Sequence, residues 1–113
     1  MLTIYHNPRC SKSRQTLQLI EEKNAPVTVV EYLKTPLTKA EIENLQGQLG
    51  VDVINMMRTK EAEFKEQNLK GADNESLLNA MVNTPKLIER PIVTDGQQAI
   101  IGRPPENVLT LIK

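Results

Sequence analysis

The apolar and polar positions at the start of the chain predict a strand, a helix and a second strand. Residues 2–5 form a short apolar and β-branched run, and Pro8 marks a break after it. Apolar residues then recur at helical spacing as far as Lys23, where Asn24-Ala25-Pro26 stops the pattern. Residues 27–32 form a second β-branched run, of the kind found in buried parallel strands. Because such a crossover is right-handed in nearly all proteins, we expect two parallel strands with the helix on one face.

The middle of the chain predicts a block of helices. Thr38-Lys39-Ala40-Glu41 has the form of a capping box, and apolar residues at helical spacing follow until Gly50, so we expect a helix over 39–49. Residues 51–57 are compatible with either a helical turn or a short strand. The charged residues 61–67 predict a surface helix, and Asn74 can cap a further helix. That last helix should end at Pro85, and its apolar face would consist of Leu77, Leu78, Met81 and Val82.

The end of the chain predicts a hairpin and a short helix. Residues 92–94 and 98–101 are apolar runs around Asp95-Gly96, a pair that suits a type I′ turn between antiparallel strands. After Gly102, two prolines at 104 and 105 open the last helix. Its apolar positions are Val108, Leu109 and Ile112. The chain therefore reads as an α/β protein.

Composition narrows the classes of function. Fourteen basic residues balance fourteen acidic ones, and there are only three aromatic residues, so neither a basic face nor a stacking platform for nucleic acid is expected. No apolar run approaches membrane length and no signal peptide is present, which predicts a cytoplasmic protein without membrane contact. With one histidine and one cysteine, a structural metal is not expected. The 113 residues fit a single domain.

The chemistry is concentrated in residues 6–14, which hold the only cysteine and the only histidine. Cys10 should lie at or near a helix N-terminus, where free N–H groups and the helix dipole favour an anion. The charged neighbours that would add to this field are Arg9, Lys12, Arg14 and, if protonated, His6. The pKa of a solvent-exposed thiol is ~8.5, and in such surroundings the thiol pKa falls to roughly 3.5–7.5. We therefore predict a nucleophilic thiolate at neutral pH.

The structural interpretation of both residues stays open at this point. A single cysteine is often a small buried hydrophobe that never reacts, and a histidine at a strand end is commonly a structural hydrogen-bonding group. A core cysteine would gain nothing from four ionisable neighbours, however. The ionisable residues near Cys10 in the sequence therefore favour the reactive interpretation.

Five motifs in series resemble the glutaredoxin-coupled arsenate reductase family. They are His6-Asn7-Pro8-Arg9-Cys10, Ser13-Arg14, Met57-Arg58, Arg90-Pro91-Ile92-Val93 and Arg103-Pro104. The resemblance runs from the first strand to the last helix. It implies a thioredoxin-like βαβ…ββα core with a helical insertion, about residues 36–86, between the second and third strands. We expect residues 1–113 to form a single domain of this kind.

The resemblance also implies roles for individual residues. Cys10 would be the nucleophile on arsenic. The catalytic arginines that would bind and polarise the oxyanion are Arg58, Arg90 and Arg103. The residues at positions that support the thiolate and the oxyanion are His6, Ser13 and Arg14. In that family the proline that matches Pro91 follows a cis peptide bond, which we expect here as well.

Arginine suits the expected substrate on physical grounds. Arsenate is a tetrahedral, mostly dianionic oxyanion at neutral pH, so an attacking thiolate meets like-charge repulsion unless cations surround it. The planar guanidinium donates parallel hydrogen bonds to two oxygens at once, which the ammonium of lysine does not do. Because Arg90 and Arg103 flank the predicted hairpin, we expect them at a common edge. Taken alone, each of the three arginines is more often structural than functional: Arg58 and Arg90 as solvated ends of helices, and Arg103 as the partner of a carboxylate.

The cysteine count predicts the source of electrons. No second thiol exists in the chain, so an adduct on Cys10 must be reduced from outside. Glutathione is the natural co-substrate, and a glutaredoxin would then resolve the mixed disulfide by thiol–disulfide exchange. We expect no bound cofactor, and a monomer whose partners are arsenate, glutathione and glutaredoxin.

Three alternatives were weighed against this prediction. Cysteine phosphatases, and the reductases that share their fold, use a Cys-x5-Arg loop, whereas Cys10 and Arg14 are separated by three residues in a loop that is not glycine-rich. Spx-type regulators bind RNA polymerase, and many carry Cys-x-x-Cys where this chain has Ser13. The third is a glutathione-linked thiol oxidoreductase with another substrate. It stays open because the chain stops at Lys113, where better-known members of the family continue into a C-terminal tail.

Overall fold

The computed structural model describes residues 1–112, and Lys113, to which the predicted domain extends, lies outside the described residues. The chain divides into two compact units, residues 1–35 with 90–112, and Pro36–Glu89. The first unit contains the sheet and the second contains the helical block that was expected at about 36–86. That the whole chain forms one domain stays a prediction.

The first unit is a four-stranded sheet in the order β2-β1-β3-β4. The strands are β1 (Leu2–Tyr5), β2 (Val27–Val30), β3 (Ile92–Thr94) and β4 (Ala99–Ile101). β1 pairs with β2 in parallel and with β3 antiparallel, and β3 and β4 form an antiparallel hairpin. The helix α1 (Ser11–Glu22) joins β1 to β2. The predicted βαβ…ββα order is confirmed, in the arrangement of a thioredoxin-like α/β fold.

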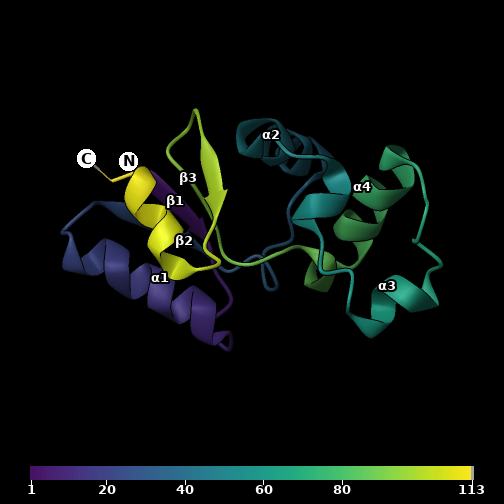
Figure 1. The fold of residues 1–113 in the computed structure, drawn as a ribbon, viewed down its shortest axis with the longest axis horizontal. Coiled ribbons are helices and arrows are strands. Elements are labelled where there is room, and N and C mark those ends of the chain that lie inside the picture. Colours follow the sequence, from purple (N-terminus) through teal and green to yellow (C-terminus); the bar gives the residue numbers. More distant parts are fainter. Residues whose placement is uncertain (113) are drawn as a thin grey trace. The chain divides into compact units, whose positions relative to one another are not determined.

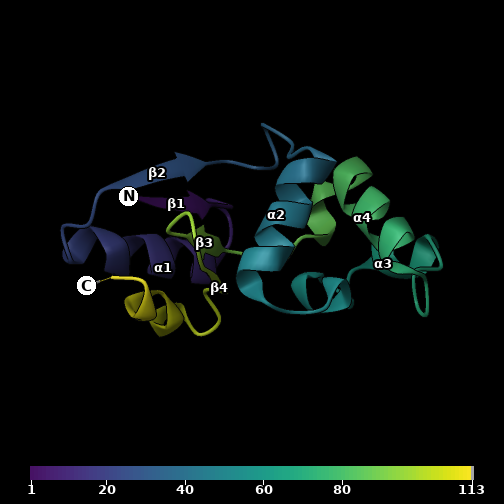
Figure 2. The ribbon, with the colours of Figure 1, turned by 90° about the horizontal axis from the view of Figure 1, so that it is seen from above.

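The core of this unit lies between the sheet and two helical segments. α1 and the 3₁₀ helix η3 (Pro105–Thr110) pack against each other and cover the same face of the sheet (Figures 1 and 2). Leu2 and Ile4 point to this face because side chains alternate along a strand. The buried cluster consists of Leu2, Ile4, Ile20, Val93, Val108 and Leu111.

The expectation that residues 27–32 form a buried strand is wrong in two respects. β2 ends at Val30, and Thr28 and Val29 are exposed, Val29 with 44% of its surface. The reason is topological, because β2 is the first strand in the sheet order and pairs only with β1. β-Branched residues suit any pleated strand and do not report whether both of its sides are covered.

The hairpin turn differs from the type I′ turn expected around Asp95-Gly96. The backbone N–H of Asp95 donates to the carbonyl of Gln98 at 3.0 Å, so the central residues are Gly96 and Gln97. Within the turn only Gly96 has a positive φ, 99°, whereas a type I′ turn needs positive φ at both central residues. The side chain of Asp95 accepts hydrogen bonds from the N–H groups of Gln97 and Gln98 at 2.9 and 2.8 Å, which moves the turn along by one residue.

The last helical segment is a 3₁₀ helix, and this changes its buried face. Val108 is fully buried and Leu111 is 8% exposed, whereas Leu109, expected on the apolar face, is 38% exposed. A 3₁₀ helix has three residues per turn, so positions three apart share a face. Sequence spacing for an α-helix therefore selected Leu109 where the structure buries Leu111.

The second unit consists of helices and 3₁₀ turns. They are α2 (Lys39–Leu49), η1 (Val53–Met56), α3 (Ala62–Glu66), α4 (Asn74–Asn83) and η2 (Pro85–Leu87). The capping box is present, with Thr38 and Glu41 bonded reciprocally, and Gly50 ends α2 in the left-handed conformation. The cap of α4 is Asp73 and not Asn74 as predicted, because the Asp73 side chain accepts from the N–H of Ser76 at 2.8 Å.

Two further features complete the second unit. Residues 53–56 form the helical turn that was one of two alternatives, and Met57 then forms an antiparallel bridge with Ile88. Among residues 1–112, no helix is both long and apolar enough to span a membrane.

Candidate functional site

The predicted nucleophile lies at the N-terminus of α1. Cys10 is the N-cap residue, with extended backbone angles (φ −94°, ψ 124°), and its carbonyl accepts from the N–H of Arg14 at 3.0 Å. The preceding turn is closed by a bond from the N–H of Cys10 to the carbonyl of Asn7, also at 3.0 Å. Cys10 is buried, with 8% of its surface exposed. The strand-turn-helix expected around this residue is confirmed.

The surroundings of Cys10 hold its pKa below the value of an ordinary thiol. Burial by itself raises the pKa, but the N–H of Ser13, the charge of Arg90, the N–H of Lys12 and the charge of Arg103 all lower it and together prevail. The N–H groups belong to the first turn of α1, where the backbone has no partners of its own. The direction agrees with the predicted thiolate.

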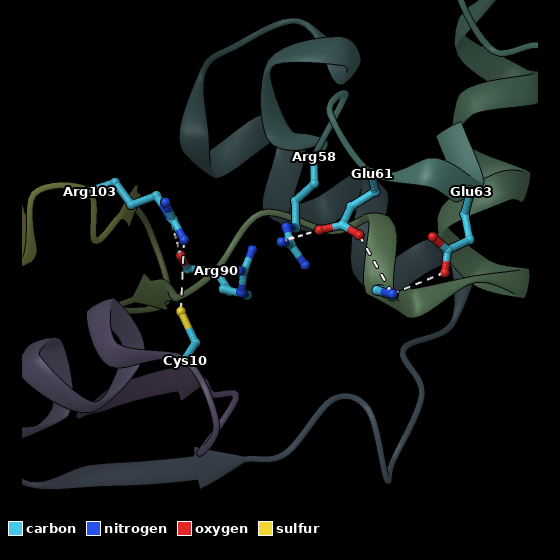
Figure 3. Close-up of polar contacts among 7 residues, drawn as sticks. Cys10, Arg58, Glu61, Glu63, Arg90 and Arg103 are labelled. Carbon is cyan, nitrogen blue, oxygen red and sulfur yellow. Dashed lines mark hydrogen bonds and ion pairs between the residues drawn. The ribbon is translucent and has the colours of Figure 1, made fainter. Parts of the chain in front are cut away.

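Two arginines from the hairpin lie beside the sulfur. The guanidinium of Arg103 donates to Cys10 Sγ over 3.7 Å, and its Nε donates to the carbonyl of Arg90 at 2.9 Å (Figure 3). Arg90 precedes β3 and Arg103 follows β4, so the antiparallel hairpin brings them to one edge. The prediction of a common edge is confirmed.

Two cis peptide bonds and a buried donor of Arg90 also lie at this edge. The Arg90–Pro91 bond is cis, as the resemblance implied, and the Arg103–Pro104 bond is cis as well. Nε of Arg90 is buried and has no hydrogen-bond partner among the described residues. A buried donor without an acceptor is costly, so an oxygen supplied by a ligand would be favourable there.

His6 and Ser13 form a buried pair behind the nucleophile loop. Nδ1 of His6 lies 2.6 Å from Oγ of Ser13, which also accepts from the N–H of Asn7 at 3.0 Å. Burial is the largest influence on His6 and lowers its pKa, assisted by Arg14, against an opposing effect of Glu31. The lowered pKa favours the neutral imidazole, so it does not support the positive charge that a protonated His6 would supply.

The three other cations near Cys10 in sequence have different positions. Arg14 donates from a guanidinium nitrogen to the carbonyl of Pro8 at 2.9 Å and so braces the nucleophile loop. Arg9 is exposed, and its backbone N–H donates to Asn7 Oδ1 at 3.0 Å. Lys12 is exposed and contributes to the site through its backbone N–H. The charges named as lowering the pKa of Cys10 are those of Arg90 and Arg103, which are distant in sequence.

Arg58 lies in the second unit, where its backbone N–H donates to the carbonyl of Leu87 at 2.7 Å. Its guanidinium pairs with Glu61, whose other oxygen lies 3.6 Å from Nζ of Lys86 (Figure 3). Lys86 also pairs with Glu63 at 3.2 Å. The role of Arg58 at the oxyanion stays a prediction.

Sequence reasoning missed the close contact between Gly102, which follows β4, and Thr16 of α1. A Cβ placed on Gly102 would lie 2.5 Å from Oγ1 of Thr16 and 2.8 Å from Cγ of Pro91. From the sequence, Gly102 was expected only to precede the last helix. A glycine that follows a strand and precedes a functional arginine is the signal that could have indicated it.

The described residues contain no cluster of three or more histidine, cysteine, aspartate or glutamate side chains that could hold a metal ion. What the geometry offers is a thiol of lowered pKa, two guanidinium groups at one edge and a helix N-terminus. Such a set can bind an oxyanion and present a nucleophile to it.

Comparisons with known proteins agree with this geometry. The sequence matches the ArsC family over residues 5–111. The uncharacterized protein YfgD of Escherichia coli (strain K12) is 49% identical over 112 residues, which cover 96% of this chain and 94% of the relative. An arsenate reductase of Haemophilus influenzae is 45% identical over 112 residues, 96% of this chain and 97% of its own. The solved structure of an arsenate reductase from Vibrio cholerae has a TM-score of 0.96 at 47% identity and covers 98% of this chain and 97% of that one.

Proposed function

The chain belongs to the ArsC family, and on that premise we propose that it is an arsenate reductase with Cys10 as its nucleophile. The observation that carries the proposal is the placement of the Arg103 guanidinium, 3.7 Å from the Cys10 sulfur, where its Nε also donates to the backbone carbonyl of Arg90. Positive groups already held where the negative charge of an oxyanion must sit need no rearrangement during the reaction. Relatives named arsenate reductase at 44–45% identity support the choice of substrate.

The first chemical step follows from the lowered pKa of Cys10. The thiolate attacks arsenic(V), an S–As bond forms, and one arsenate oxygen leaves as water after taking up protons. Arg90 and Arg103 would offset the repulsion between the thiolate and the dianion. Arg90 also brings the unpartnered donor of its buried Nε, which an oxyanion oxygen would satisfy.

The reduction needs an external thiol, because the chain has one cysteine. In our proposal glutathione attacks the sulfur of the Cys10 adduct. The S–As bond breaks, its electron pair reduces arsenic(V) to arsenic(III), and arsenite leaves. Cys10 is then joined to glutathione by a disulfide, which a glutaredoxin thiol resolves to regenerate the thiolate.

The remaining predicted residues have supporting parts in this proposal. Arg58 would bind the oxyanion as a further cation. Ser13 supports the thiolate through its backbone N–H, and its hydroxyl bonds the neutral His6. Arg14 supports it indirectly by bracing the loop at Pro8.

The test is arsenate-dependent oxidation of NADPH in a mixture of the purified protein, glutathione, glutaredoxin and glutathione reductase. We expect turnover that requires every component and is abolished in Cys10→Ser. A control, Ser11→Ala, changes the adjacent exposed residue and should turn over as the wild type does. Turnover of arsenate by Cys10→Ser would refute the assignment. No turnover by a wild type with a reduced, reactive thiol would refute arsenate as substrate and favour another glutathione-linked substrate or an Spx-like binding role.

A further inference from the structure

We propose that Gly102 is a positioning residue, whose missing side chain lets the hairpin approach α1 closely enough to hold Arg103 against the Cys10 sulfur. The inference rests on the proposed function for its kinetic consequence. Its structural part concerns the thiol alone and can be tested without arsenate.

The space around Gly102 is too small for a side chain. A Cβ there would lie 2.5 Å from Thr16 Oγ1, 2.8 Å from Pro91 Cγ and 3.1 Å from Thr16 Cγ2. Real Cβ contacts are not this short, so any side chain would force neighbouring atoms to move. The positive-φ glycines are Gly50, Gly71 and Gly96, so at Gly102 the requirement is space and not backbone angle.

The neighbours of Gly102 are held in place. Thr16 is fully buried in α1, and its hydroxyl donates to the carbonyl of Lys12 at 2.8 Å, which fixes its rotamer. Pro91 is buried next to the fully buried Ile92, and its ring has no long flexible end that could turn away. The carbonyl of Pro91 also accepts from the N–H of Gly102 at 2.9 Å. A larger residue at 102 would therefore displace its own backbone.

The backbone of Gly102 continues directly into that of Arg103, the proposed catalytic arginine. Arg103 is the next residue, and its backbone is held by a bond from its N–H to the carbonyl of Ile101 at 2.8 Å. The side-chain amide of Asn107 donates to the carbonyls of Ile101 and Arg103, both at 3.2 Å. These bonds fix the backbone of Arg103 relative to that of Gly102. A displacement at 102 thus carries over to the Arg103–Cys10 contact.

The contact is sensitive to such a displacement. The guanidinium reaches Sγ over 3.7 Å, and the same side chain must keep its 2.9 Å bond to the Arg90 carbonyl. Cys10 belongs to α1 and Arg103 to the hairpin, so the distance between them depends on how closely α1 and the hairpin pack. Where α1 and the hairpin meet, Thr16 lies so near to Gly102 that there is no room for a Cβ at residue 102.

The experiment measures the thiol in Gly102→Ala by the pH dependence of Cys10 alkylation with iodoacetamide. We expect the midpoint to move up toward that of an ordinary thiol, because Arg103 no longer stabilises the thiolate at its present distance. With arsenate, kcat/KM should fall about ten- to a hundredfold, the range expected when a catalytic group is misplaced by up to an ångström. Gly47→Ala is the matched control, since Gly47 in α2 has nothing within 4 Å of a Cβ, and both measurements should be unchanged.

A double-mutant cycle separates positioning from a general structural defect. Combined with Arg103→Ala, Gly102→Ala should cause no further rise of the alkylation midpoint, because its effect acts through Arg103. Thr16→Ala combined with Gly102→Ala removes two of the three short contacts and should partly restore the midpoint. It also gives a folded variant if Gly102→Ala alone does not fold.

Two results would overturn the proposal. One is an unchanged alkylation profile in folded Gly102→Ala, and the other is a full additional shift when Gly102→Ala is placed on Arg103→Ala. Because alkylation needs no arsenate, these outcomes are decided even if the protein proves to reduce a different substrate.

Discussion

At the scale of single residues, the groups that lower the pKa of Cys10 are distant in sequence as well as near. The first turn of α1 supplies the N–H groups of Lys12 and Ser13, while Arg90 and Arg103 come from the hairpin. Of the cations adjacent to Cys10 in sequence, Arg14 bonds the carbonyl of Pro8 through its guanidinium. The neighbours of Cys10 in the sequence predicted a lowered thiol pKa, and the structure agrees in direction, but the particular arginines required either a resemblance or a structure.

The lowered pKa of Cys10 has a consequence for stability. The thiol titrates lower in the folded chain than in the unfolded one, so the folded state binds fewer protons between the two pKa values. The resulting stabilisation is complete above the unfolded value and is lost as the pH falls through the folded one. Relative to Cys10→Ser, which does not titrate in this range, the reduced wild type should therefore gain stability between pH 5 and roughly pH 9, near the usual thiol pKa.

Urea unfolding of the two proteins at both pH values measures this difference. A free-energy difference between wild type and Cys10→Ser that is the same at both ends of the range would show that Cys10 is not a stabilised thiolate.

Arg103 makes two contacts through different nitrogens of its guanidinium, and the single ammonium of lysine does not offer this arrangement. Its Nε bonds the Arg90 carbonyl while another nitrogen reaches the sulfur. An ammonium keeps the charge but loses this fork. We expect Arg103→Lys to lower kcat/KM for arsenate at least about tenfold, which corresponds to roughly 1.4 kcal/mol of transition-state stabilisation.

The matched control for that substitution is Arg9→Lys. Arg9 is exposed and its bond to Asn7 is made by the backbone N–H, which the substitution retains. Steady-state kinetics of both variants should separate them, and equal losses in the two would contradict a specific role for the Arg103 fork.

At the scale of elements, the sequence predicted best where local chemistry determines the boundary. The helix α2 begins and ends where the capping box and Gly50 place it. The same reasoning chose Asn74 over its neighbour Asp73 for α4, because both residue types cap helices and only the fold decides between them. The 3₁₀ form of η3 and the shifted hairpin turn were missed for a similar reason, since spacing alone does not distinguish adjacent registers.

The capping box gives a prediction for the second unit. Thr38 Oγ1 accepts from the N–H of Glu41 at 3.2 Å, and the N–H of Thr38 donates to the Glu41 carboxylate at 3.0 Å. Thr38→Ala leaves the first of these donors without its partner. The free energy of unfolding should fall by about 1 kcal/mol.

Chemical denaturation measures that loss, with Thr59→Ala, an exposed threonine outside the helices, as the reference substitution. Equal stabilities of the two variants would mean that the capping box does not support α2.

At the scale of the whole molecule, the number of thiols decides what the protein needs from others. One cysteine can form an adduct with arsenic but cannot form a disulfide within the chain. In the proposed function, each reduction would therefore leave Cys10 joined to a thiol from outside. The family and the solved relatives establish the fold on which this chemistry rests, and the dependence on glutathione is the step of the account that is most open to a direct test.

That test is a single turnover without glutaredoxin. Reduced protein is mixed with arsenate and glutathione and quenched. The arsenite released is counted per protein, and the mass of the Cys10 peptide is determined. We predict one arsenite per protein and one glutathione on Cys10, with further turnover only when glutaredoxin is added. Arsenite released from a protein whose Cys10 carries no glutathione, or from Cys10→Ser, would contradict the account.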